Sequence, residues 1–424
     1  MRRRWPTPLA LWTVIFVVAY GTNVPTPLLL IYRQLLGLSP TELTSAFAVY
    51  AAGLVPALLL AGPASDRFGR KPVVVPFVVL SAVTSLLFLG AAHSTFVLFA
   101  GRFLQGAVSG VVFSIGTAWL GELVGAGPAA AARSARLTTA ALGGGWALGP
   151  LVTGLLAQWA PWPTVLPFAV HIALMLLGIV LLAGIPETLS PNRRRIGGPL
   201  LHFGVPASAR WPFALVVLPI AVAVFTFPST AVTVLPLQLI PAMPDIAVAV
   251  TGIVSGITLG TGVIAQPLVR MLGVTMAGPV GVAIGAGGLG LSLLADALGS
   301  WPLLLPVSVL LGVAYGLCLA AGLTLTAQIA SPTARGALTG TFYACAYLGF
   351  GAPVLLSLGR GTNGFAGALA GLAVIAAVVA ALLLTPAARR LVPPGPAPTG
   401  PQGRPRRGRA PERRERHAAR SRRW

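Results

Sequence analysis

Ten consecutive residues bring an acid, three bases and two glycines together. They read Gly62-Pro-Ala-Ser-Asp66-Arg67-Phe-Gly69-Arg70-Lys71 and lie between two apolar runs, 43–62 and 73–93. A carboxylate in this setting can cap a helix start or pair with arginine, and Gly69 gives the backbone the freedom that a short connection needs. The pattern predicts a network of charged contacts in a short loop between two buried helices.

Polar residues also lie inside apolar runs. Arg102 is the lone charge in the run 96–119, and a charge within a membrane costs about 2.5–3.5 kcal/mol on insertion scales. It is a candidate functional residue that faces inward, or else an arginine bonded to backbone carbonyls. Asn23, beside the run-breaking Pro25, is our leading candidate for a ligand contact, or else it and Thr22 only satisfy the kink. Further candidates for the same pathway are Gln105, Trp146, Tyr315, Tyr343 and Tyr347.

Apolar runs must position these residues. Charged residues make up only 9 % of the chain, hydrophobic ones 56 %, and the mean hydropathy is +0.86, whereas soluble domains carry about 25 % charge. A membrane-spanning helix needs about 20 apolar residues. The sequence predicts an all-α integral membrane protein with twelve such helices, near 9–31, 43–62, 73–93, 96–119, 137–158, 164–184, 213–240, 248–269, 273–295, 301–325, 337–358 and 364–385.

The twelve runs divide into two similar sets of six. Arg133 and Gly149 stand sixteen residues apart in the first set, as do Arg335 and Gly351 in the second, which is typical of transporters built from repeats. Small residues recur as Gly145, Gly149, Pro150 and Gly154, on what we expect to be one face for helix contact. We therefore predict two pseudo-symmetric six-helix bundles at 1–187 and 213–386, a cytoplasmic linker at 188–212, and a disordered, Arg-rich tail at 387–424.

The net charge of +21 follows the membrane rather than a nucleic acid. The tail from 387 to 424 carries a net +10, which leaves +11 for the rest, and that remainder lies almost wholly in alternate loops, with only Arg33 and Arg360 on the other side. This bias predicts a multi-pass protein of the cell (plasma or inner) membrane with both termini cytoplasmic. A cleaved signal at the start is the alternative, but it would break this parity. The tail could contact acidic lipid, and no nucleic acid is expected.

Several chemistries are excluded by what the sequence lacks. Gly285 to Gly290 resembles a dinucleotide fingerprint, but it lies inside an apolar run, where helix packing explains it. A phosphate-binding loop needs Lys followed by Ser or Thr, and the only lysine, Lys71, precedes Pro72. Cys318 and Cys345 fall within apolar runs without ligand-like neighbours. We expect no enzyme activity, no ATP hydrolysis, no catalytic residues, no cofactor and no bound metal.

At the first motif the sequence resembles the major facilitator superfamily, whose signature in that loop is G-x-x-x-D-R-x-G-R-[KR]; every signature residue is present. The resemblance covers roughly 9–386 and implies that Gly62, Asp66, Arg67, Gly69, Arg70 and Lys71 form a cytoplasmic gate. The second half departs from it, with Gln266 and Pro267 in place of Asp-Arg. Arg102, Gln105 and Gly106 match the family's R-x-x-Q-G pattern, associated with proton transfer, and Gly145 to Gly154 match its antiporter motif in part.

These observations predict a carrier that works by alternating access. We expect proton-coupled efflux of a small organic solute by a monomer, with a same-fold importer or uniporter as the alternative and a non-transporting scaffold or receptor as a remote one. No carboxylate lies near mid-membrane, and His171 is the one span residue that titrates near neutrality. The lone Arg102 favours anionic, zwitterionic or neutral substrates over cations.

Overall fold

The computed structural model describes residues 7–189, 204–331, 335–362 and 364–392, which form one compact unit. In these ranges helices alternate with short connections, and the one β-pairing is an isolated bridge between Gly361 and Gly364. Twelve helical stretches of the described chain are long and apolar enough to cross a membrane. The predicted all-α class and the predicted number of spans are confirmed.

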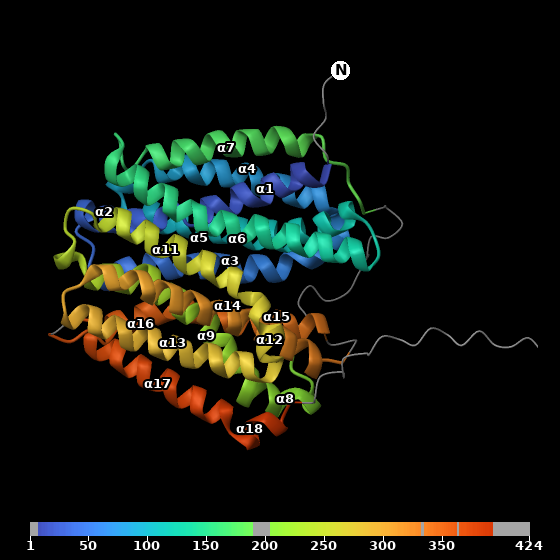
Figure 1. Ribbon diagram of the computed structural model, residues 1–424. Helices are drawn as coiled ribbons and strands as arrows, with labels where there is room; N and C mark the ends of the chain where they lie inside the picture. The colour runs from blue at the N-terminus through green and yellow to red at the C-terminus, as the bar shows by residue number, and fades with distance from the viewer. Residues whose placement is uncertain (1–6, 190–203, 332–334, 363, 393–424) are drawn as a thin grey trace, which may run out of the picture. The chain divides into compact units, whose positions relative to one another are not determined.

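Six spans precede residue 190 and six follow residue 203 (Figure 1). The first six are built from α1 (Thr7–Thr22) with α2 (Pro25–Leu36), α3 (Pro40–Phe68), α4 (Arg70–Phe88), α5 (Thr95–Val124), α6 (Pro128–Trp159) and α7 (Leu166–Ala183). The seventh span contains α8 (Arg210–Pro212), η4 (Phe213–Val217), α9 (Leu218–Ser229), η5 (Thr230–Val234) and α10 (Leu235–Gln238). The eighth contains α11 (Ala247–Ala265), η7 (Gln266–Leu268) and α12 (Val269–Leu272), and the ninth and tenth contain α13 (Val274–Ala297) and α14 (Leu304–Ile329). The eleventh contains α15 (Arg335–Tyr347), η9 (Leu348–Gly351) and α16 (Ala352–Leu358), and the twelfth is α17 (Ala366–Leu384).

Prolines interrupt the first and seventh spans. The first span breaks at Asn23 and Val24, directly before Pro25. The seventh span widens into π-helical turns at η4 and η5, which precede Pro219 and Pro236. Proline lacks the N–H that a regular α-helix would use and clashes with the preceding turn, so wider turns accommodate it. These interruptions lie inside the first and seventh spans rather than at their ends.

Two boundaries differ from the prediction. The seventh span begins at Ala207, six residues before the predicted start at 213, so part of the predicted linker is helical. The short helix α18 (Pro386–Arg390) occupies the start of the predicted disordered tail, because the Thr385 hydroxyl accepts the N–H of Ala388 and caps it. Linker residues 190–203 and tail residues 393–424 lie outside the described residues.

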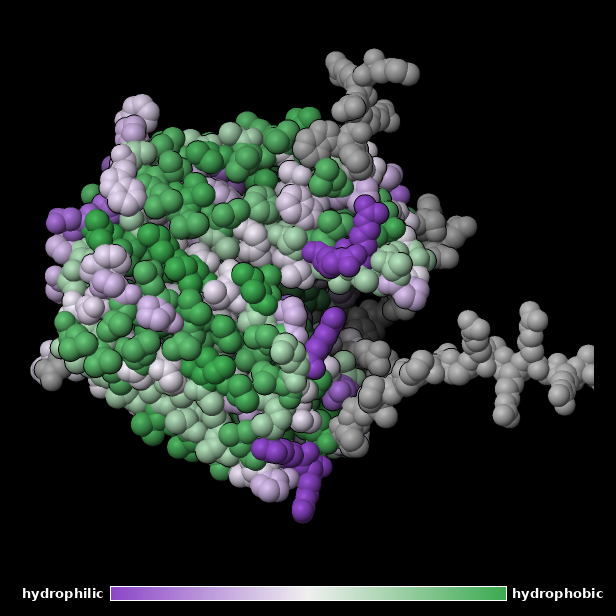
Figure 2. Space-filling view, in the orientation of Figure 1, coloured by the Kyte–Doolittle hydropathy of each residue, from purple (hydrophilic) through white to green (hydrophobic). Residues whose placement is uncertain are grey.

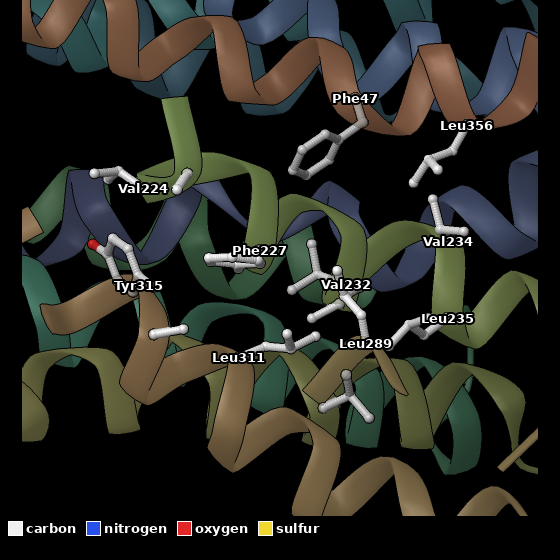
Figure 3. Close-up of a cluster of buried hydrophobic side chains, with 14 of the residues drawn as sticks. Phe47, Val224, Phe227, Val232, Val234, Leu235, Leu289, Leu311, Tyr315 and Leu356 are labelled. Carbon is white, nitrogen blue, oxygen red and sulfur yellow. The ribbon is translucent and has the colours of Figure 1, made fainter. Parts of the chain in front are cut away.

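The two sets of six helices pack against each other most closely through α6 and α11. A large buried cluster lines the second set and extends into the first. Figure 3 shows its centre, where Phe227 and Val232 lie with Phe47 on one side and Leu311 on the other. Large apolar side chains also cover much of the outer surface, as the green areas of Figure 2 show. A lipid environment requires such a surface.

Charged side chains distinguish the two ends of the helices. We call the end that carries Arg67, Arg70, Lys71, Arg133 and Arg270 the basic face, and the other end the opposite face. In Figure 2 hydrophilic side chains stand at several places along the basic face, among them near α12 and α18, and the surface is hollowed between the first and the second set of helices.

Candidate functional site: a central aromatic cavity

A cavity lies where the two sets of helices meet near the proline breaks. Its empty volume is about 520 Å³ with its open side included, which is within the range of small-molecule sites. Both halves contribute side chains. The lining residues are Thr22, Asn23, Phe47, Tyr50, Trp146, Phe225, Pro228, Ser229, Val232, Leu259, Tyr315, Tyr347 and Phe350.

Aromatic rings form a continuous wall across the junction. The Phe225 ring lies 4.8 Å from the Tyr347 ring and 5.0 Å from the Phe350 ring, centroid to centroid. Phe350 of the second half is in turn 5.3 Å from Phe47 of the first half and 5.8 Å from Tyr50. Stacked rings present flat, polarisable faces that bind planar or apolar solutes. The wall therefore offers stacking surfaces rather than fixed charges.

The sequence candidates fall into three groups. Asn23, Trp146, Tyr315 and Tyr347 line the cavity. Arg102 and Gln105 lie buried behind the lining, and Tyr343 stacks beside Tyr347 without lining it. Asn23 follows the last residue of α1, and its side chain makes no hydrogen bond within the described residues, whereas the Thr22 hydroxyl donates to the Val18 carbonyl at 3.0 Å. The carbonyls of Gly21 and Thr22 at the break accept from Gln105 and Arg102, so the Asn23 amide is not used to satisfy the kink and is free for a ligand.

Sequence reasoning missed several lining residues, among them Phe47, Tyr50, Phe225, Ser229 and Phe350. Two signals could have found some of them. Phe225 precedes the helix-breaking Pro228 by three residues, and Tyr347 and Phe350 stand one turn apart on the helix that corresponds to α6 in the first set. No comparable signal marks Phe47 among the other apolar residues of α3.

Arg102 is fully buried, with 1 % of its surface exposed. Its guanidinium donates to the carbonyls of Ala46 and Phe47 on α3 and to the carbonyl of Thr22 at the break of the first span, each at 3.2 Å. It also donates to Gln105 Oε1 at 2.7 Å. Its charge lies over the Phe47 and Tyr50 rings, 5.4 and 5.0 Å from their centroids. These two rings stand between the charge and the cavity.

His171 is also sequestered from the cavity. Its Nε2 lies 3.2 Å from the Val17 carbonyl oxygen, which can only accept, so Nε2 carries the proton and donates. Its Nδ1 then accepts from the Ser85 hydroxyl at 2.6 Å. A side chain larger than hydrogen at Gly21 would collide with this ring. His171 thus joins α1, α4 and α7 as a packed side chain.

At the basic face the signature residues form the predicted charged contacts. Arg70 Nη1 donates to Asp66 at 2.7 Å, and Arg70 Nη2 donates to Glu122 of α5 at 3.0 Å. The Thr188 hydroxyl also donates to Glu122. The connection itself is a single residue, Gly69, so Asp66 and Arg70 stand on helix ends rather than in a loop. Within the described residues both ion pairs stay inside the first half.

Glu187 completes this network at the start of α4. Its carboxylate accepts the backbone N–H of Lys71 at 2.9 Å, and a Cβ on Gly69, whose φ is +105°, would lie 2.7 Å from its oxygen. The Lys71 ammonium donates to the carbonyls of Ala183 and Ile185, each at 2.9 Å. Gly69 is required both by its positive φ and by this close carboxylate. Arg67 lies over the neighbouring Phe68 ring, and Gly62 faces open space.

We expect the Glu187 carboxylate to make the stability of the protein at the basic face depend on pH in the acid range. Partial burial acts to raise the pKa of its carboxyl, but backbone N–H groups of Leu189, Lys71, Arg70 and Thr188 outweigh it and lower the pKa. The stabilisation is therefore complete above the ordinary pKa of about 4.3 and is lost as the pH falls through the lowered one.

Between pH 6 and pH 3, thermal unfolding of Glu187→Gln should be less pH-dependent than that of the parent. Asp245→Asn, which changes an exposed loop acid, is the control and should keep the parent's pH dependence; equal slopes for Glu187→Gln and the parent would contradict the assignment.

The glycines of the antiporter-like motif face two different partners, not one. A Cβ on Gly145 would lie 2.6 Å from the Phe16 carbonyl oxygen, and one on Gly149 would lie 2.2 Å from the Tyr20 oxygen, so both pack on α1. Gly154 instead contacts Gly252 of α11. It stands five residues after Gly149, with Pro150 between them, and this spacing places it on another face of α6. The motif therefore holds the first bundle together and also joins it to the second.

Other contacts close the opposite face. The Gln158 amide donates to the Asp245 carbonyl at 2.8 Å and accepts the Ala249 N–H at 3.2 Å, across the two halves. The Thr44 hydroxyl donates to Ser357 at 3.1 Å, also across the halves. Within the described residues no three metal-ligating side chains lie close enough to hold an ion.

Comparison with known proteins agrees with this fold. The family model of the Major Facilitator Superfamily matches residues 11–352. Multidrug resistance protein MdtL of Escherichia coli O157:H7 (strain EC4115 / EHEC) is 42 % identical over 85 residues, which is 20 % of this chain and 22 % of that protein. MdtL of Escherichia coli (strain K12 / DH10B) is 41 % identical over 85 residues. The chain thus spans about a fifth of the length of the curated relatives it matches.

Solved transporter structures share the fold over almost the whole chain. A POT family transporter in complex with 5-aminolevulinic acid superposes with a TM-score of 0.74 and 13 % identity, covering 89 % of this chain and 95 % of that one. A D-xylose-proton symporter superposes with a TM-score of 0.66 and 19 % identity, covering 91 % and 97 %. Because the family model covers most of the chain and the twelve spans fold as in these transporters, the chain belongs to the major facilitator superfamily.

Proposed function

We propose that this transporter exports a small, flat organic solute that stacks in the central aromatic cavity. The observation that carries the proposal is the wall of rings from both halves, with the free amide of Asn23 and the Ser229 hydroxyl at its edge. Apolar walls with a few polar groups are typical of sites that take many related solutes. The partial likeness to a multidrug resistance protein favours export.

The proposed cycle moves the two halves about this cavity. Contacts of Gln158, Gly154 and Thr44 close the opposite face, and Figure 2 shows a hollow at the basic face, so we take the described conformation as open toward the basic face. We place the basic face in the cytoplasm of the cell membrane, following the positive-inside bias. The network of Asp66, Arg70 and Glu122 is then the inner gate, which closes against the second half after the solute has entered. The proton, taken up as the solute leaves, is the proposed coupling ion.

Uncoupled passage, or import, is the second candidate. One observation favours it: the cavity lining contains no carboxylate and no histidine, so none of these side chains titrates near neutrality. A proton-coupled carrier needs a titratable group on the solute's path, or a gate that responds to the protonation of such a group. The two candidates differ in whether solute movement drives protons.

Reconstituted vesicles separate the candidates. The full chain is placed in proteoliposomes that contain a pH-sensitive dye, and a planar aromatic dye is added on one side. Antiport predicts solute-driven proton movement in the opposite direction and solute accumulation against its gradient when a pH jump is imposed. Counterflow without any proton movement would replace antiport by uniport. Equal uptake by protein-free vesicles would contradict transport of this solute class.

Asn23→Ala should weaken solute binding without unfolding the protein. The Asn23 side chain makes no hydrogen bond within the described residues, so its removal leaves no partner unpaired. One lost hydrogen bond to a ligand is worth about 0.5–1.5 kcal/mol, so we expect a severalfold rise in the dissociation constant, measured by quenching of tryptophan fluorescence, to which Trp146 in the lining contributes. Thr13→Ala, whose hydroxyl bonds only within α1, is the matched control. Unchanged affinity in Asn23→Ala would remove Asn23 from the site.

A further inference from the structure

A second cavity lies at the opposite face, on the seam between the halves. Its empty volume is about 480 Å³ with its open side included. Arg33 and Pro40 line it from the first half. The second half contributes Leu237, Gln238, Ile240, Pro241, Arg360 and Phe365. The cavity is separate from the aromatic one, with which it shares no lining residue.

Two positive charges share this cavity without a counter-charge. Arg33 and Arg360 are the lysine or arginine residues that the described chain places at the opposite face. Neither forms an ion pair with an acid within the described residues. Three acids lie at the opposite face: Glu42 accepts from the N–H and hydroxyl of Ser39, Asp296 accepts from the Gln238 amide at 2.8 Å, and the exposed Asp245 forms no ion pair within the described residues. Two like charges brought together at a seam repel each other.

Arg360 is held in place by its surroundings. Its guanidinium lies 5.5 Å from the centroid of the buried Phe365 ring. The turn that follows it is closed by the two hydrogen bonds between Gly361 and Gly364, at 3.1 and 3.2 Å. Gln238 accepts the Phe365 N–H at 2.9 Å, and a Cβ on Gly364 would lie 2.7 Å from its oxygen. The closed turn thus holds the backbone beside Arg360, while its guanidinium, on an exposed residue, lies over the Phe365 ring.

The helix dipole favours a cation at the position of Arg33, but it does not neutralise the charge of the guanidinium. Arg33 lies in the last turn of α2, where a cation interacts favourably with the helix dipole. Its own carbonyl is used by the N–H groups of Gly37 and Leu38. The guanidinium itself makes no hydrogen bond in the described chain and is left to face the shared cavity.

We propose that this cavity binds a compact oxyanion, a phosphate or carboxylate group, between Arg33 and Arg360. The planar guanidinium fork matches the two oxygens of such a group. Because the two arginines come from different halves, a bound oxyanion joins them and favours the conformation whose opposite face is closed. The group can belong to a free anion or to a lipid headgroup at this face.

Thermal unfolding of the purified full chain in neutral detergent tests the proposal. Inorganic phosphate is titrated against chloride at equal ionic strength. We expect a saturable rise of the unfolding midpoint in the parent, and an apparent affinity at least about tenfold weaker in Arg33→Gln and in Arg360→Gln, as loss of a charge-assisted bond implies. Arg270→Gln removes a positive charge at the basic face and should respond as the parent does.

A gain-of-function variant guards against a merely damaged protein. Arg33→Glu supplies a tethered carboxylate opposite Arg360, so its midpoint in chloride should match or exceed the parent's and its response to phosphate should disappear. A second arm places the protein in nanodiscs of phosphatidylglycerol or phosphatidylcholine. Stabilisation by phosphatidylglycerol that requires both arginines, without any effect of free phosphate, identifies the source as lipid. Equal responses of the parent and both Gln variants in every arm would overturn the proposal.

Discussion

Gly154→Ala should slow transport by about 5- to 150-fold, because the added methyl has no room when the opposite face closes. A Cβ at this position would lie 2.7 Å from Gly252 Cα and 2.9 Å from the Val248 carbonyl oxygen, both backbone atoms that no rotamer change can move. Overpacking of this kind costs about 1–3 kcal/mol, and the cost falls on one conformation of the cycle. Transport of the planar dye in proteoliposomes measures the effect.

The same two helices provide a matched control. A Cβ on Gly260 of α11 would lie 3.6 Å from the Ala147 Cβ, which is an ordinary contact, so Gly260→Ala should transport at the parent's rate. Spin labels at Leu35→Cys and Leu358→Cys, both exposed near the opposite face, should report a wider separation in Gly154→Ala than in Gly260→Ala. The labelled chain also carries Cys318→Ala and Cys345→Ala. Equal distances and equal rates would show that the Gly154 contact is not part of the closure.

The fold could be predicted because the membrane imposes it on the sequence. Apolar runs of the right length can be read directly, and the signature from Gly62 to Lys71 placed the connection between the second and third spans. Boundaries were less certain, because capping and helix continuation depend on local contacts. The cap on α18 by Thr385 and the helical start at Ala207 are examples.

The candidate site was predictable only in part. Asn23 could be found because a polar side chain beside a mid-span proline is unusual, and it does line the cavity. The aromatic wall could not, since Phe47, Phe225 and Phe350 meet only through packing of distant helices. Glu187 shows the same limit, because its role at the start of α4 depends on a contact 116 residues away in the chain.

Arg102→Met should destabilise the protein more strongly than any single change in the cavity wall. It would leave three backbone carbonyls and Gln105 Oε1 without their donor in a buried site. Each charge-assisted bond is worth about 1.5–3 kcal/mol, so a loss of at least about 3 kcal/mol is expected, measured by denaturant unfolding in detergent. Arg102→Lys should recover only part of it, because one ammonium cannot reach carbonyls on both α3 and the first span.

The same variants decide between two roles for Arg102. If Arg102 only holds α3 and the first span together, transport per folded molecule keeps the parent's pH profile in Arg102→Lys, whereas a part in proton transfer would shift that profile.

The charge of Arg102 also acts on the cavity through the Phe47 and Tyr50 rings, because the guanidinium lies over both rings on the side away from the cavity. A cationic dye should therefore bind the parent more weakly than a neutral dye of the same shape. Preference for the cationic dye, unchanged in Arg102→Met, would show that the buried charge does not select the substrate.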